Sequence, residues 1–90
     1  MRIDDLLWLD HIVDKLEIKH QVVPSEVYEV FWNRPRFRYC VPGENVYRVM
    51  GCTDSRRYLV VFFVYKPADH LALIISAREM TDKERKSYGR

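Results

Sequence analysis

The fold is decided by one apolar stretch of the sequence, YLVVFFVYK, residues 58–66. Successive side chains of a β-strand point to opposite faces of the sheet. Both faces of this strand are apolar, one carrying Leu59, Val61 and Phe63 and the other Val60, Phe62 and Val64. Such a pattern is typical of a central strand that is covered on both sides. The rest of the chain must therefore supply neighbouring strands and cover for two faces.

Three further strands are predicted around this centre. Residues 34–39 alternate arginine with Pro35, Phe37 and Tyr39, which indicates a half-buried strand with its arginines outside and its aromatic rings in the core. Next come a turn (VPGEN, residues 41–45), a strand (VYRVMGC, 46–52) and a second turn (TDSRR, 53–57). After the central strand, PADH (67–70) turns the chain into a fourth strand, residues 71–77.

Helices are predicted at both ends of the chain. Residues 7–9 can form a short strand, and Asp10 can then cap a helix that buries Ile12, Val13 and Leu16 and fades near His20. A second helix begins near Pro24 and buries Val27, Val30 and Phe31, antiparallel to the first. Thr81 and Glu84 form the capping box of a short helix near the C-terminus.

These elements predict a single α+β domain over residues 1–90. Two N-terminal helices pack on a small antiparallel sheet of about four strands, and a short C-terminal helix follows. Because that last helix has few apolar groups, we expect a partner chain or a second copy to cover part of the other face.

The charge and composition narrow the class of protein. Residues 1–33 hold seven acidic and three basic side chains, whereas residues 34–90 hold six acidic and twelve basic ones. The basic part can pair internally with the acidic part or face a polyanion or an acidic partner. Acidic residues interrupt the N-terminal apolar stretch and the longest apolar run is shorter than a membrane span, so a cytoplasmic protein is expected. Cys40 and Cys52 are expected to be reduced thiols.

Three small groups of residues could carry chemistry: Lys19 with His20, Arg56 with Arg57, and Arg78 with Tyr88. Cleaving RNA through its own 2′-hydroxyl requires a proton acceptor, cations around the phosphate and a proton donor to the leaving oxygen. These side chains can fill those roles without a metal or cofactor. Each also has a structural interpretation: a helix C-terminal cap, a solvated turn, and an ion pair of Arg78 with Glu84 or Glu26.

The arginines of residues 34–39 have their own alternatives. Arg34, Arg36 and Arg38 are expected on one face of a strand, where they could contact phosphates or an acidic partner. His11 and Asp14 lie one helical turn apart, but the pattern shows no third ligand, so no metal site is predicted.

Four ordered segments carry a resemblance to a known family: KLEIKHQV (15–22), SEVYEVF (25–31), YRVMGCTDSRRYLVVFF (47–63) and IISAREMTDKERKSY (74–88). Together they resemble the BrnT family, the toxin halves of bacterial type II toxin-antitoxin pairs. The resemblance spans roughly residues 7–88, and its most specific part is ISAR followed by ERKSY.

The resemblance implies a RelE-like fold and an endoribonuclease that inhibits translation. It implies as partners an RNA substrate and a ribbon-helix-helix antitoxin, in a complex of two toxins with two antitoxins, or a homodimer where the antitoxin is absent. No cofactor, metal or membrane is implied. The residues expected to carry catalysis are Lys19, His20, Arg57, Arg78 and Tyr88, and those expected to contact RNA or a partner are Arg34, Arg36, Arg38, Arg48 and Arg85.

One position departs from the family pattern. Members often carry an arginine shortly before IISAR, where this chain has Leu73 in LALIISAR. Losing a cation there would weaken phosphate stabilisation if that arginine is catalytic. The alternative function is therefore an inactive member that docks a DNA-binding antitoxin or another acidic protein.

Overall fold

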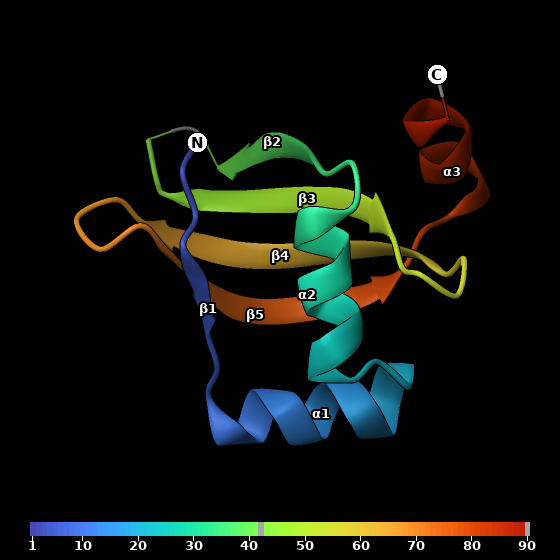
Figure 1. Ribbon diagram of the computed structural model, residues 1–90, viewed down its shortest axis with the longest axis horizontal. Coiled ribbons are helices and arrows are strands. Elements are labelled where there is room, and N and C mark those ends of the chain that lie inside the picture. The colour runs from blue at the N-terminus through green and yellow to red at the C-terminus, as the bar shows by residue number, and fades with distance from the viewer. Residues whose placement is uncertain (42, 90) are drawn as a thin grey trace.

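A mixed sheet in the order β1-β5-β4-β3-β2 forms the centre of the molecule (Figure 1). The computed structural model describes residues 1–41 and 43–89, and within them the sheet has five strands. The strands are β1 (Asp5–Leu7), β2 (Arg36–Val41), β3 (Val46–Cys52), β4 (Tyr58–Lys66) and β5 (Leu71–Glu79). The α+β class and the central place of residues 58–66 are confirmed. The prediction of about four antiparallel strands was wrong.

The extra strand is β1, which lies at the edge of the sheet and runs parallel to β5. Its backbone pairs Asp5 with Leu71 and Leu7 with Leu73. The predicted strand at residues 7–9 therefore begins and ends two residues earlier. With three residues and one buried side chain, Leu6, β1 has too short an alternating pattern to be placed by sequence alone.

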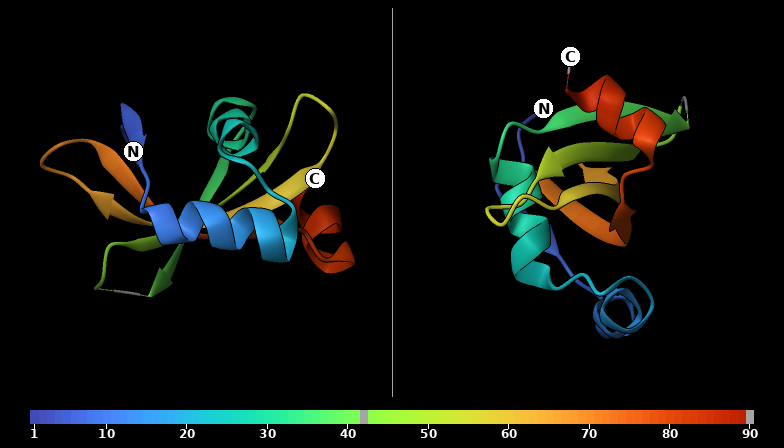
Figure 2. Two further views of the ribbon diagram at one scale, coloured as in Figure 1. Left: turned by 90° about the horizontal axis from the view of Figure 1, so that it is seen from below. Right: turned by 90° about the vertical axis from the view of Figure 1, so that its right-hand side faces the viewer.

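Helices α1 (Asp10–His20) and α2 (Pro24–Trp32) cover one face of the sheet (Figure 2). Helix α1 packs against β5, and α2 packs against β3 and β4. The core between these layers contains buried side chains from both helices and from the sheet, among them Leu16, Val27, Val30, Phe31, Leu59, Val61, Phe63 and Ile74. No helix within residues 1–41 and 43–89 is both long enough and apolar enough to cross a membrane.

The relation between α1 and α2 differs from the prediction. Figure 1 shows α2 lying across α1 rather than antiparallel beside it. The chain turns at Gln21, which has a left-handed backbone conformation with φ 51°, and the next helix begins only three residues later. The expected cap was also wrong, because Leu9 stands at the N-cap and Asp10 is already helical.

The opposite face of the sheet carries no long helix. Val60 and Met50 are buried there, whereas Phe62 and Val64 are half-buried. Helix α3 (Asp82–Tyr88) lies at one end of the sheet and has no buried residue of its own. The Arg78 guanidinium lies 5.6 Å from the centre of the Phe62 ring, so arginine side chains supply some of the missing cover.

The arginine-rich strand begins and ends two residues later than predicted. Arg34 precedes β2 and has a left-handed conformation with φ 51°, so it does not share a face with Arg36 and Arg38. Phe37 packs against the core as expected. Tyr39 was expected in the core, but its exposed fraction is 64%, and its ring stacks on Tyr47 with centroids 4.4 Å apart. Residue 42 of the predicted turn lies outside the described residues.

Candidate nucleic-acid interface

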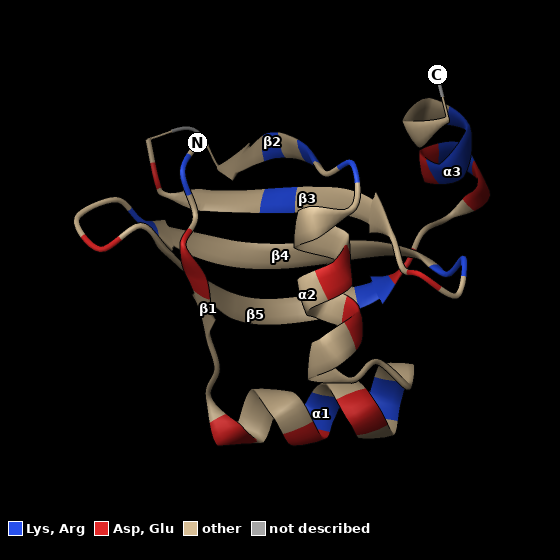
Figure 3. Cartoon of the chain, in the orientation of Figure 1, with Lys and Arg blue, Asp and Glu red and all other residues tan. Residues whose placement is uncertain are grey.

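Basic side chains gather where β4 begins and β5 ends. We call this region the basic end and define it by the arginines that four segments bring there: Arg34, Arg36, Arg56, Arg57, Arg78 and Arg85. In Figure 3 the blue segments lie in β2, in the loop between β3 and β4, at the end of β5 and in α3. Their spacing in the sequence does not group these four segments, because they meet only through the order of the strands in the sheet.

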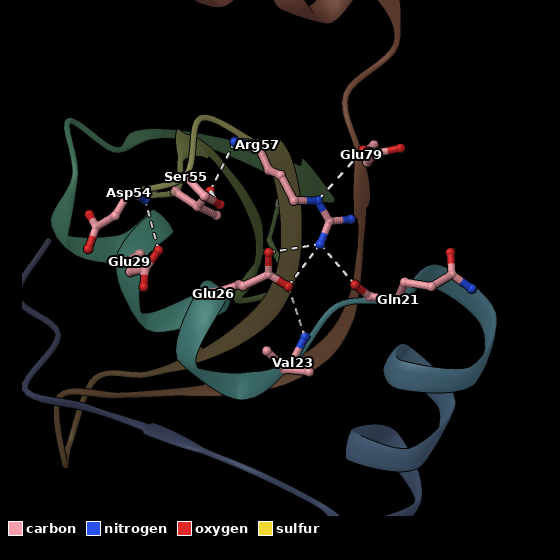
Figure 4. A network of polar contacts seen from close by, with 9 residues as sticks. Gln21, Val23, Glu26, Glu29, Asp54, Ser55, Arg57 and Glu79 are labelled. Atoms are coloured by element: carbon pink, nitrogen blue, oxygen red, sulfur yellow. Dashed lines mark hydrogen bonds and ion pairs between the residues drawn. The ribbon is translucent and has the colours of Figure 1, made fainter.

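Arg57 is the centre of a polar network that ties α1, α2 and β5 together (Figure 4). Its Nη1 donates to both carboxylate oxygens of Glu26 at 2.8 Å and to the backbone oxygen of Gln21 at 2.8 Å. Its Nε lies 3.7 Å from a carboxylate oxygen of Glu79. Arg57 is therefore charge-paired, and it also caps the C-terminal end of α1.

The turn before Arg57 is built around one buried hydroxyl. The Thr53 side chain is buried, and its Oγ1 accepts a hydrogen bond from the Arg57 backbone N–H at 2.9 Å. The Arg56 N–H donates to the Thr53 carbonyl oxygen at 3.0 Å, with Arg56 in the left-handed region at φ 70°. This turn points the Arg57 side chain at Glu26 and leaves Arg56 on the rim of the basic end.

Arg78 is also paired with a carboxylate. Its Nη1 and Nη2 donate to the two oxygens of Glu84 at 2.7 and 3.0 Å. Arg48 lies 3.5 Å from the same carboxylate, and the Thr81 N–H donates to it at 2.8 Å. The hydrogen bonds from Arg78, helped by those of Thr81, lower the pKa of Glu84 to about 2. Of the two ion pairs that the sequence left open for Arg78, the structure forms the one with Glu84.

The surroundings of Arg78 depend on a β-bulge. Phe62 pairs with Ser76 and Phe63 pairs with Ile74, so Ile75 is the extra residue. In a regular strand Ile74, Ser76 and Arg78 would share one face, but the bulge turns Ile74 to the other face, where it is buried in the core. Arg78 follows the bulge on the face opposite to α1 and α2.

Tyr88 closes the basic end from α3. Its hydroxyl donates to the Arg34 carbonyl oxygen at 3.1 Å, and its ring meets Tyr58 edge-on with centroids 6.1 Å apart. Burial raises the pKa of Tyr88, while Arg34 and Arg36 act in the opposite direction. The hydroxyl is consequently protonated at neutral pH and acts as a donor.

A hollow of about 550 Å³ opens beside Tyr88 and Tyr58, with Trp32, Arg34 and Arg56 also in its wall. A second hollow of about 310 Å³ adjoins it and is lined by Arg34, Arg36 and the same two tyrosines. Arg78 lines neither of these two hollows. Tyr88 and Arg78, which were grouped from the sequence, therefore lie on different parts of the basic end.

Lys19 and His20 lie at the C-terminal end of α1. His20 is half-buried and Lys19 is exposed, and within residues 1–41 and 43–89 neither side chain forms a hydrogen bond or an ion pair. The bond from Arg57 to the Gln21 carbonyl brings this helix end next to the Arg57 network. The structure therefore joins Arg57 to the C-cap of the helix that carries Lys19 and His20, and the shared site of these residues stays a prediction.

The remaining basic residues have different surroundings. Arg36 donates to the Ser87 carbonyl oxygen at 3.3 Å and lies over the Tyr88 ring, and Arg85 lies over Tyr58 at 4.1 Å. Arg38 donates to the Phe37 carbonyl oxygen. Among the described residues, no carboxylate forms an ion pair with Arg34, Arg56 or Arg85. At the basic end, these three are cations that a bound anion could neutralise.

Sequence reasoning missed Trp32 and Tyr58 as parts of the site. Trp32 ends α2 with an exposed fraction of 56%, which is unusual for the last apolar residue of a packed helix. Tyr58 is the first residue of the central strand, and the sequence pattern does not distinguish it from the apolar residues that follow. Within the described part of the chain, no group of three or more His, Cys, Asp or Glu residues could hold a metal ion.

Comparison with known proteins adds no assignment to this geometry. No protein-family model matches the chain, and no curated protein is significantly similar to it.

Proposed function

We propose that this chain is a toxin of the BrnT type with a RelE-like fold, an endoribonuclease that inhibits translation by cutting RNA through the 2′-hydroxyl without a metal. The observation that carries the proposal is the convergence of six arginines, two tyrosines and the Lys19–His20 helix end on one end of the sheet. Arginine and tyrosine side chains suit a single-stranded polyanion, because they combine charge with flat stacking surfaces.

The geometry assigns roles within this proposal. Arg34, Arg56 and Arg85, which have no carboxylate partner among the described residues, are placed to bind phosphate groups. Arg57 and Arg78 already hold Glu26 and Glu84, so their first task is to position the end of α1 and the start of α3.

In this proposal, the residues that transfer protons lie at the C-terminal end of α1. Lys19 and His20 remain the groups for this task, because arginine stays protonated at neutral pH and Tyr88 acts as a donor.

A ribbon-helix-helix antitoxin is the proposed partner, in a complex of two toxins with two antitoxins. It would cover the helix-free face of the sheet, where Phe62 and Val64 are half-buried and Arg36, Arg38 and Arg48 project. A second copy of the chain would take that place where no antitoxin is present.

One observation favours a second function, that of an inactive docking module. Arg57 and Arg78, two of the five residues expected to carry catalysis, are engaged by Glu26 and Glu84. In this alternative the chain leaves RNA intact and binds its acidic or DNA-binding partner through Arg36, Arg38 and Arg48. Changing these three arginines to glutamate should then abolish partner binding.

Expression in growing bacterial cells separates the two functions. The nuclease proposal predicts growth arrest by the wild-type chain, with relief by His20→Ala and by Arg78→Ala. Lys66→Ala, a change to an exposed basic residue at the far end of β4, should still arrest growth. Cells that express the wild-type chain, as shown by immunoblot, but grow as well as cells with an empty vector would contradict the nuclease and leave the docking module.

A further inference from the structure

The hollow between α2, the β3–β4 turn and α3 has an aromatic wall, and the proposed nuclease roles assign no task to two of its rings, Trp32 and Tyr58. Its wall contains Trp32, Arg34, Arg56, Tyr58 and Tyr88. We propose that this hollow is a binding subsite for one unpaired nucleotide of single-stranded RNA, with the base stacked on Trp32 and the flanking phosphates held by Arg34 and Arg56. The proposal deepens the proposed function and rests on it for the identity of the nucleic acid.

Stacking is supported by the exposure of Trp32. Residue Trp32 has an exposed fraction of 56%, although Phe31 and Tyr28 contact its ring edge-on. A large aromatic ring held by other rings, with its remaining surface open, is a preformed platform for a nucleobase. Tyr58 and Tyr88 complete an aromatic wall, and they are themselves covered by Arg85 and Arg36.

Phosphate binding is supported by the two arginines on the rim. Neither Arg34 nor Arg56 forms an ion pair with a described carboxylate. Asp54 also lines the hollow, but its carboxylate accepts a hydrogen bond from the Asn33 amide at 2.7 Å. Two cations against one hydrogen-bonded carboxylate leave the hollow net positive.

Backbone strain points to the same place. Arg34 and Arg56 have φ angles of 51° and 70°, in the left-handed region that side-chain-bearing residues rarely adopt. Such conformations persist where the surrounding structure enforces them, and they concentrate at binding sites. Here the enforcing contacts are the bond from Tyr88 to the Arg34 carbonyl and the Arg56 N–H bond to Thr53.

The chain offers a built-in reporter for a test. Its tryptophans are Trp8 and Trp32, and Trp8→Phe keeps an aromatic ring at the position that packs against Tyr28. In that variant all tryptophan emission comes from Trp32. The probe is a 12-nucleotide RNA of mixed sequence with 2′-O-methyl groups, which cannot be cut through its 2′ oxygen.

The inference predicts saturable quenching of Trp32 by the single-stranded probe, and little quenching by the same RNA annealed to its complement. Binding is measured by the fluorescence anisotropy of the labelled probe. It should weaken at least roughly fivefold in each of three variants: Arg34→Asn, Arg56→Asn and Trp32→Ala. Asparagine is chosen because it tolerates the left-handed region. Lys66→Ala, the matched control, should change binding less than about twofold.

Three results would overturn the inference: equal quenching by the duplex, equal quenching by a hexaglutamate peptide, or unchanged binding by the Arg56→Asn variant. The outcome is independent of cleavage. Quenching by the probe, with unmodified RNA left intact, would retain the subsite and reject the nuclease. Cleavage of RNA without any quenching would reject the subsite and retain the nuclease.

Discussion

The task of each arginine at the basic end is set by the presence or absence of a carboxylate beside it. Arg57 and Arg78 both make several charge-assisted hydrogen bonds to glutamate, and they therefore act in the architecture before they can act on a ligand. Arg34 and Arg56 have no such partner among the described residues. Sequence spacing could not separate the two kinds, because Glu26 and Arg57 lie 31 positions apart.

The Arg78–Glu84 pair makes the free energy of unfolding depend on pH in the acidic range. The pKa of Glu84 is about 2 in the folded chain, against an ordinary value of 4.5. Because the folded pKa is depressed, this stabilisation is complete above about pH 4.5 and is lost as the pH falls towards 2. Glu84→Gln should lower the free energy of unfolding by about 1–2 kcal/mol at pH 7, the value being reduced by solvent around the half-buried Arg78.

Urea unfolding at pH 7 and at pH 3 measures this effect. The difference between wild type and Glu84→Gln should shrink at pH 3, because the Glu84 carboxylate of the unfolded chain, with its ordinary pKa of 4.5, is then mostly protonated while that of the folded chain is not. The control is Glu17→Gln, a change to an exposed helix residue, which should lie within about 0.5 kcal/mol of wild type at both pH values. A difference between wild type and Glu84→Gln that is the same at both pH values would refute the role assigned to the pair.

At the scale of elements, the parts that sequence predicted well are those with a strong local pattern. The two-sided apolar residues 58–66 form the central strand, and Thr81 and Glu84 form the predicted capping box with bonds of 3.2 and 2.8 Å. The bulge at Ile75 and the crosswise path of α1 and α2 have no such local pattern. They arise from tertiary pairing and from the single left-handed residue Gln21.

Helix α3 is held by polar and aromatic contacts instead of a buried apolar side. The contacts come from Glu84, Ser87 and Tyr88, and the helix has no buried residue. Its last turn nevertheless forms part of the wall of the basic end. The place of α3 was predictable only as far as its start, because the partners of Ser87 and Tyr88 lie more than fifty positions away.

The packing of α2 on β3 depends on Gly51. A Cβ at this position would lie 2.7 Å from the Val30 carbonyl oxygen and 2.9 Å from its Cγ1. Gly51→Ala should therefore push α2 outward and destabilise the fold by about 1–3 kcal/mol, as measured by thermal or urea unfolding. Gly89→Ala is the matched control, since its Cβ would make an ordinary contact at 3.4 Å and should leave stability nearly unchanged. Equal stability of both variants would contradict the close approach.

In the whole molecule, internal ion pairs neutralise only part of the opposite charges of the acidic N-terminal part and the basic remainder of the chain. Glu26 from the acidic N-terminal part neutralises Arg57, which is the internal pairing that the sequence left open. Of the other arginines of the basic end, Arg34 and Arg56 line a hollow of about 550 Å³, and Arg34 and Arg36 line one of about 310 Å³. A cationic surface with aromatic walls is the arrangement that suits a polyanion with exposed bases.

We propose that the basic end of the molecule cuts RNA through the 2′-hydroxyl. The most direct measurement is incubation of the purified chain with a single-stranded RNA in the presence of EDTA, with analysis of the ends produced. We expect the wild-type chain to cleave the RNA and leave 2′,3′-cyclic phosphate ends. The rate should fall at least roughly 100-fold in His20→Ala. No cleavage should occur where a 2′-deoxy residue precedes the scissile phosphate. Intact RNA with the wild-type chain, or equal cutting at the 2′-deoxy position, would contradict it.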